Sequence, residues 1–120
     1  MLEGTQMEKI ITLPKSGATV VLRDPAELRQ KDREKVFSMI SAEDTPLIQT
    51  MNITKGLIML LVKSWTLDLM IPSVLMASIG ELEMADYDAL AIEANKAQDI
   101  LFPNFTTGDN PDSPKDNLND

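Results

Sequence analysis

The chain has 120 residues with a formal net charge of -8, and it contains no cysteine and no histidine. This length predicts one domain with one core, and the acidic balance argues against binding of nucleic acid through phosphate neutralisation. The missing residue types exclude disulfides, zinc sites of the Cys/His type and the usual nucleophile pairs. We therefore expect a single non-enzymatic domain without a metal or a cofactor.

Neither a secretory signal nor a membrane span is expected. The N-terminal stretch MLEGTQMEKI has no basic region followed by an apolar one. The most apolar window, residues 56–76, is interrupted by Lys63, Asp68 and Pro72, whereas a span needs about 18 or more uncharged apolar residues. We expect a protein of the cytoplasm that has no membrane partner.

The first predicted element, after a flexible N-terminus at residues 1–7, is a β-hairpin. Its strands are two β-rich runs, residues 9–13 and 19–22, and the segment PKSG between them supplies the turn. Because a two-stranded hairpin is only marginally stable alone, it must pack on the rest of the chain.

Two helices are predicted next, each from a capping residue followed by proline. Asp24 and Pro25 indicate a helix over residues 25–41, and Thr45 and Pro46 indicate a second one. Apolar positions recur at helical spacing through the second helix as far as Trp65, so it is the expected core element. Gly56 near its middle costs about 1 kcal/mol relative to alanine, which predicts either a close packing contact or a kink.

The rest of the domain is predicted as a loop, a linker and a third helix. Residues 66–71 read as an extended segment, residues 73–84 as a linker with a short helical turn, and residues 85–102 as the last helix. Asp86 and Asp88 fall in its first turn, where the helix dipole favours carboxylates, and their spacing does not suit a catalytic pair. The predicted fold class is mainly α: a three-helix domain with an N-terminal β-hairpin, over residues 8–105.

Residues 106–120 are predicted to form a disordered acidic tail, since they contain almost nothing to bury. Prolines fall at ligand positions of a calcium loop, so we expect no metal there. Just before the tail, Phe102 and Phe105 flank Pro103 and Asn104. They read either as a hydrophobic clasp for the end of the last helix or as a short motif for a partner.

A partner-binding surface is the remaining functional candidate. The chain contains eight methionines, and flexible thioether side chains suit adaptable surfaces, although they also fill cores. Its single tryptophan reads as a core residue or as an anchor for a partner. The candidate partner-binding residues are Trp65, Leu69, Met70, Ile71, Val74, Leu75, Met76, Ile79 and Phe105.

Several blocks of the sequence, taken in order, resemble one family. The blocks are TLPKSGATVVLRDPAEL, LLVKSWTLDL, ADYDAL and LFPNF followed by DNPDSP, and together they span about residues 11–114. They resemble the short tail assembly chaperones of long-tailed phages, especially phages of actinobacteria. The segment MIPSVLMASIGELEM is more apolar than the charged loop expected of that family, which makes it the candidate binding surface.

The resemblance implies a non-enzymatic protein that acts in the host cytoplasm and is absent from the mature virion. It would bind the tape measure protein, keep the apolar helices of that protein soluble, and help to recruit the tail tube protein. A longer form, made by ribosomal frameshifting, is a further implied partner, and a homo-oligomer is left open.

Two other classes of protein remain as alternatives. One is an intracellular acidic adaptor or antitoxin-like module that binds one folded partner through the methionine-rich surface. The other is a small enzyme that uses only carboxylates and lysine. Neighbouring genes distinguish the chaperone from the antitoxin-like module, because a downstream tape measure gene favours the chaperone and a toxin gene favours the antitoxin.

The implied frameshift predicts a slippery site in the gene. Ser113, Pro114 and Lys115 are compatible with a heptamer of the CCC-AAA type. Sequencing the coding region should show this heptamer followed by an overlapping frame. A non-slippery sequence without such a frame would remove the proposed site.

Overall fold

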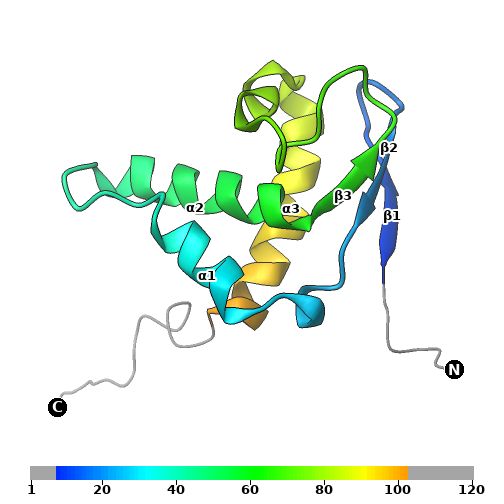
Figure 1. Cartoon of the computed structure of the whole chain (residues 1–120). Coiled ribbons are helices and arrows are strands. Elements are labelled where there is room, and N and C mark those ends of the chain that lie inside the picture. The colour runs from blue at the N-terminus through cyan, green and yellow to red at the C-terminus, as the bar shows by residue number, and fades with distance from the viewer. Residues whose placement is uncertain (1–7, 103–120) are drawn as a thin grey trace, which may run out of the picture.

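A computed structural model describes residues 8–102, in which a small antiparallel sheet packs beside three α-helices (Figure 1). This confirms the mainly helical class with an N-terminal hairpin. The predictions for residues 1–7, for Phe105 and for the tail at residues 106–120 lie outside the described residues.

The sheet has the order β1, β2, β3, and both neighbouring pairs are antiparallel. Its strands are Lys9–Thr12 (β1), Thr19–Leu22 (β2) and Val62–Trp65 (β3). The predicted hairpin of β1 and β2 is confirmed, and β3 adds a third strand that the sequence pattern did not predict. The third strand gives the hairpin the support that two strands alone would lack.

The hairpin turn is closed by backbone hydrogen bonds on both sides. Leu13 N–H donates to the Ala18 carbonyl at 2.7 Å, and the Leu13 carbonyl accepts from Gly17 N–H at 3.0 Å. Gly17 has φ of 78°, in the left-handed region that glycine adopts without steric cost. The predicted turn residues are therefore in the positions that their chemistry favours.

Helix α2 (Pro46–Leu61) begins as predicted but ends earlier. Thr45 Oγ1 accepts from Ile48 N–H at 3.3 Å, and Pro46 is the first helical residue. The prediction that the helix continues to Trp65 is wrong, because the chain becomes extended at Val62 and pairs with β2. A short apolar run fits a buried strand as well as a helix, so its pattern alone could not place this boundary.

The first predicted helix is also wrong in its extent. Asp24 caps only a single 3₁₀ turn, η2 (Pro25–Glu27). A separate helix, α1 (Gln30–Phe37), follows it. The backbone is extended at Leu28 and Arg29, between η2 and α1. The Asp32 carboxylate accepts from Arg29 N–H at 2.9 Å and so caps the start of α1. The extended backbone at Leu28 lets that side chain pack against the core.

The last elements agree with their predictions. The linker contains the 3₁₀ helix η3 (Met76–Glu81), and α3 (Met84–Leu101) differs from the predicted range by one residue at each end. Phe102 follows α3 and is buried, with its ring centroid 5.2 Å from that of Phe37. Of the two residues of the predicted clasp, Phe102 thus packs on the domain, whereas Phe105 lies outside the described residues.

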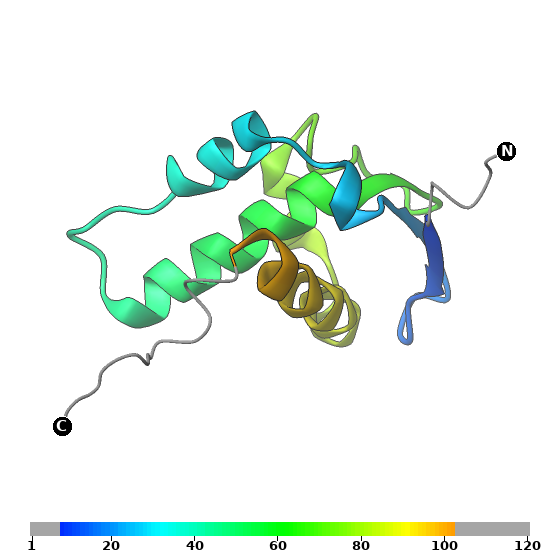
Figure 2. The ribbon, with the colours of Figure 1, turned by 90° about the horizontal axis from the view of Figure 1, so that it is seen from below.

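The core forms around α2, with α1 along one side of that helix and α3 on the other (Figure 2). Side chains from the sheet complete it. The most buried apolar residues are Leu13, Val20, Val36, Leu57, Ile58, Val62, Leu90, Ala94 and Ala97. Among residues 8–102, no helix combines the length and the apolar character that a membrane crossing needs.

Gly56 in α2 lies against side chains of α1 and of the turn that follows α1. A Cβ atom at this position would lie 3.0 Å from Met39 Sδ and 3.3 Å from Val36 Cγ1. Of the two predicted explanations for this glycine, the structure shows the close packing contact.

Gly56→Leu should therefore destabilise the fold by roughly 1–3 kcal/mol, as overpacking of a filled site does. Gly80→Leu is the matched control, because a Cβ atom at Gly80 meets nothing within 4 Å, and surface changes stay within about 0.5 kcal/mol. Urea denaturation followed by circular dichroism measures both. Equal stability of the two variants would contradict the close α1–α2 contact.

Candidate protein-binding surface

The loop between β3 and η3, residues 66–75, carries most of the predicted binding residues. Trp65, the last residue of β3, is half-buried against the core, and its indole Nε1 donates to the Leu69 carbonyl at 2.8 Å. Trp65 also pairs with Val20 in the sheet. It therefore closes the first part of the loop onto the domain.

The second part of the loop is a hydrogen-bonded turn. The Ile71 carbonyl accepts from Val74 N–H at 2.9 Å and from Leu75 N–H at 3.0 Å. Pro72 within this turn is buried, and Ile71 packs against the core. These contacts fix the backbone that carries the neighbouring apolar side chains.

Three predicted binding residues point to the outside of this loop: Met70 is 58% exposed, Val74 is 63% exposed and Leu75 is 50% exposed. We call these three residues the apolar loop patch. The loop lies beside η3 and the N-terminal end of α3 (Figure 1). Contiguous exposed apolar surface marks protein-binding sites, so these three side chains, which are close in sequence on an ordered loop, are the candidate site.

The other predicted binding residues lie deeper. Ile79 is only 3% exposed and belongs to the core, because η3 turns this side chain inward. Ile71 and Met76 are half-buried and pack against the core, and Leu69 is half-buried as well. In this structure they support the loop, while the apolar loop patch forms its outer surface.

Asp86 has a structural function that the sequence pattern did not reveal. It lies in the first turn of α3 as predicted, but its buried carboxylate accepts from the hairpin turn. Lys15 N–H donates to Oδ1 at 2.7 Å, and Ser16 N–H donates to Oδ2 at 3.2 Å. The carboxylate therefore joins two segments that are 70 residues apart in the chain.

The environment of Asp86 acts on its pKa in two directions. Burial, the largest single cause, raises the pKa. The hydrogen bonds from Lys15 N–H and from the Ser16 hydroxyl and N–H, together with the Lys15 charge, lower the pKa by more than burial raises it. The pKa of Asp86 therefore lies below its ordinary value of 3.8. The ionised form is thus the one that the fold favours. The backbone N–H groups of a tight turn need acceptors when they are buried. The sequence of the turn does not identify which distant residue supplies the acceptor.

We compared the chain with protein-family models, with curated proteins and with solved structures, and none of them matches it. Within residues 8–102, no three acidic side chains gather where they could hold a metal ion.

Asp86→Asn should lower the urea midpoint at pH 7, since it removes the charge from the acceptor of the turn N–H groups. A group with a lowered folded-state pKa stabilises above its unfolded pKa, which is about 3.9 for Asp, and loses this effect as the pH falls through the folded value. The difference between wild type and Asp86→Asn should therefore shrink below about pH 4.

Asp88→Asn is the control for that experiment, because Asp88 is exposed. Asp88 lies two residues beyond Asp86 in α3, and the prediction that it falls in the first turn is wrong, since the helix begins at Met84. A purely dipolar role would make the effect of Asp86→Asn small and close to that of Asp88→Asn, since the helix dipole contributes only about 0.3–1 kcal/mol at a helix end. Equal midpoints for the two variants at pH 7 would contradict the role of Asp86 as the acceptor for the hairpin turn.

Proposed function

We propose that the protein is the short form of a tail assembly chaperone of a long-tailed phage, which binds the tape measure protein and helps to recruit tail tube subunits without catalysing a reaction. The observation that carries the proposal is the apolar loop patch, in which Met70, Val74 and Leu75 are at least half exposed on a hydrogen-bonded loop. A client with apolar helices offers the complementary surface.

The physical chemistry of the patch suits such a client. An amphipathic helix binds by laying its apolar face against an apolar surface, and a methionine adapts its shape to different partners. The net charge of -8 would keep the complex in solution while the apolar face of the client is covered. A chaperone for aggregation-prone helices needs both properties.

The sequence blocks that resemble the phage family support the same proposal. One block forms the hairpin and η2, a second runs from the end of α2 through β3 into the loop, and a third contains Asp86 at the start of α3. The Asp86 bonds to the hairpin turn join the first and third blocks, and the Trp65 bond to Leu69 lies within the second block and closes the start of the loop.

The proposal also specifies where and with what the protein acts. It works in the host cytoplasm before the tail is complete and is absent from the mature virion. Its longer frameshifted form carries the same domain and shares the client. The tail tube protein is the subunit that the complex helps to recruit.

Co-expression with a phage tape measure protein tests the proposal. The full chain should raise the soluble fraction of that protein, and Met70→Ser combined with Val74→Ser should weaken the complex by roughly tenfold or more, as loss of interface anchors does. Both side chains are exposed, so the fold should persist. Soluble and pellet fractions are compared on gels, and affinity is measured on the co-purified complex.

Leu47→Ser combined with Met51→Ser is the matched control, since these α2 side chains are 72% and 44% exposed. This control should leave the complex intact. If it abolishes the complex while the loop variant does not, the client binds α2 and the loop assignment is wrong. No gain in solubility with the unaltered chain would contradict the chaperone proposal and favour the adaptor or antitoxin-like alternative.

A further inference from the structure

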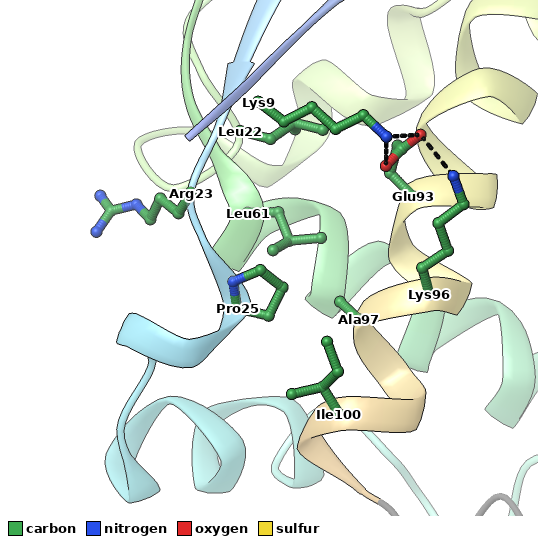
Figure 3. A pocket seen from close by; sticks show the side chains of 9 residues that line it. All are labelled: Lys9, Leu22, Arg23, Pro25, Leu61, Glu93, Lys96, Ala97 and Ile100. Carbon is green, nitrogen blue, oxygen red and sulfur yellow. Dashed lines mark hydrogen bonds and ion pairs between the residues drawn. The ribbon is translucent and has the colours of Figure 1, made fainter. Parts of the chain in front are cut away.

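A cleft with a volume of about 180 Å³ lies between the sheet, η2 and α3 (Figure 3). None of the residues that line it belongs to the apolar loop patch. Its apolar walls include the buried side chains of Leu22, Leu61 and Ala97, and Ile100 closes one end. This volume is below the roughly 300–1,000 Å³ of small-molecule sites and close to the roughly 150 Å³ cavity that holds a benzene molecule. The cleft therefore has room for one large apolar side chain.

The rim of the cleft is basic, although the whole chain has a net charge of -8. The Glu93 carboxylate pairs with Lys9 Nζ at 3.0 Å and with Lys96 Nζ at 3.4 Å (Figure 3). Two ammonium groups thus share one carboxylate, which leaves a positive charge at this rim. Because an ammonium group has three N–H donors, both lysines can donate to a further acceptor without releasing Glu93.

The lysine side chains are accessible, while the carboxylate between them is not. The side chains of Lys9 and Lys96 are 51% and 62% exposed, compared with 15% for Glu93. Ile92, Lys96 and Ile100 lie at intervals of four residues and so share one face of α3. Ile92 and Ile100 are 57% and 58% exposed, so the apolar surface continues on both sides of Lys96.

We propose that this cleft, which we call the β1–α3 cleft, is a second docking site for an acidic segment of another protein. A leucine or phenylalanine side chain of that segment enters the cleft, and a neighbouring carboxylate accepts hydrogen bonds from Lys96 and Lys9. Charge complementarity selects the segment: the acidic surface attracts basic chains elsewhere, whereas the lysine rim repels them here. This inference stands independently of the proposed phage function.

Fluorescence anisotropy with labelled synthetic peptides and the full chain tests the site. The probe is Gly-Glu-Leu-Phe-Glu-Glu-Leu-Gly, compared with one peptide in which Lys replaces every Glu and one in which Ser replaces Leu and Phe. The acidic apolar peptide should bind, and both altered peptides should bind at least roughly tenfold more weakly, since each lacks one half of the recognition.

Variants of the protein locate the binding. Lys96→Gln should weaken binding of the acidic peptide roughly threefold to fivefold, and Ile100→Ser should weaken it roughly tenfold. Ile100→Leu should restore it. Lys31→Gln and Leu47→Ser, both at exposed positions outside the cleft, are the matched controls and should bind as the wild type does.

Wild-type affinity of both Lys96→Gln and Ile100→Ser would overturn the proposal, as would equal binding of the three peptides. Circular dichroism confirms that the variants are folded. A further arm replaces Asp109, Asp112, Asp116 and Asp120 by Asn in the full chain. Unchanged affinity is expected, whereas clearly tighter peptide binding would identify the chain's own acidic residues as the occupant and overturn the assignment to another protein.

Discussion

The fold depends on the point where α2 changes directly into β3. Leu61 ends the helix and Val62 begins the strand with no loop between them, while the Leu61 carbonyl accepts from Arg23 N–H at 2.7 Å. Because α2 packs against both other α-helices and β3 pairs with β2, this junction sets the position of the sheet relative to the helices. The bulge at Lys63, which skips one residue in the pairing with β2, accommodates the change.

Both proposed binding surfaces follow from this arrangement. The loop at residues 66–75 leaves the end of β3, and its course is set by the Trp65 bond to Leu69 and by the turn at Ile71. Those bonds hold Met70 and Val74 outward, where both side chains are more than half exposed. The β1–α3 cleft exists because the sheet stands beside α3 at a distance that Lys9 and Glu93 bridge. The domain thus combines an apolar surface and a basic cleft on an acidic molecule.

Local chemistry accounts for what could be predicted, and competition between distant partners accounts for what could not. The caps at Asp24 and Thr45 act through neighbouring N–H groups, so sequence proximity was enough to find them. The strand β3 pairs with the edge of β2, which lies 40 or more residues earlier in the chain. The apolar pattern of residues 57–65 contains no information about this distant partner. Likewise, the inward turn of Ile79 and the role of Asp86 depend on contacts that only the folded chain defines.

We propose above that the client covers the apolar loop patch. Hydrogen–deuterium exchange measures this directly, with the purified protein alone and in complex with the tape measure protein. If the client covers this patch, complex formation should slow exchange at residues 66–76 and leave exchange in the N-terminal turns of α2 unchanged. Unchanged exchange at residues 66–76 in a stable complex would contradict it.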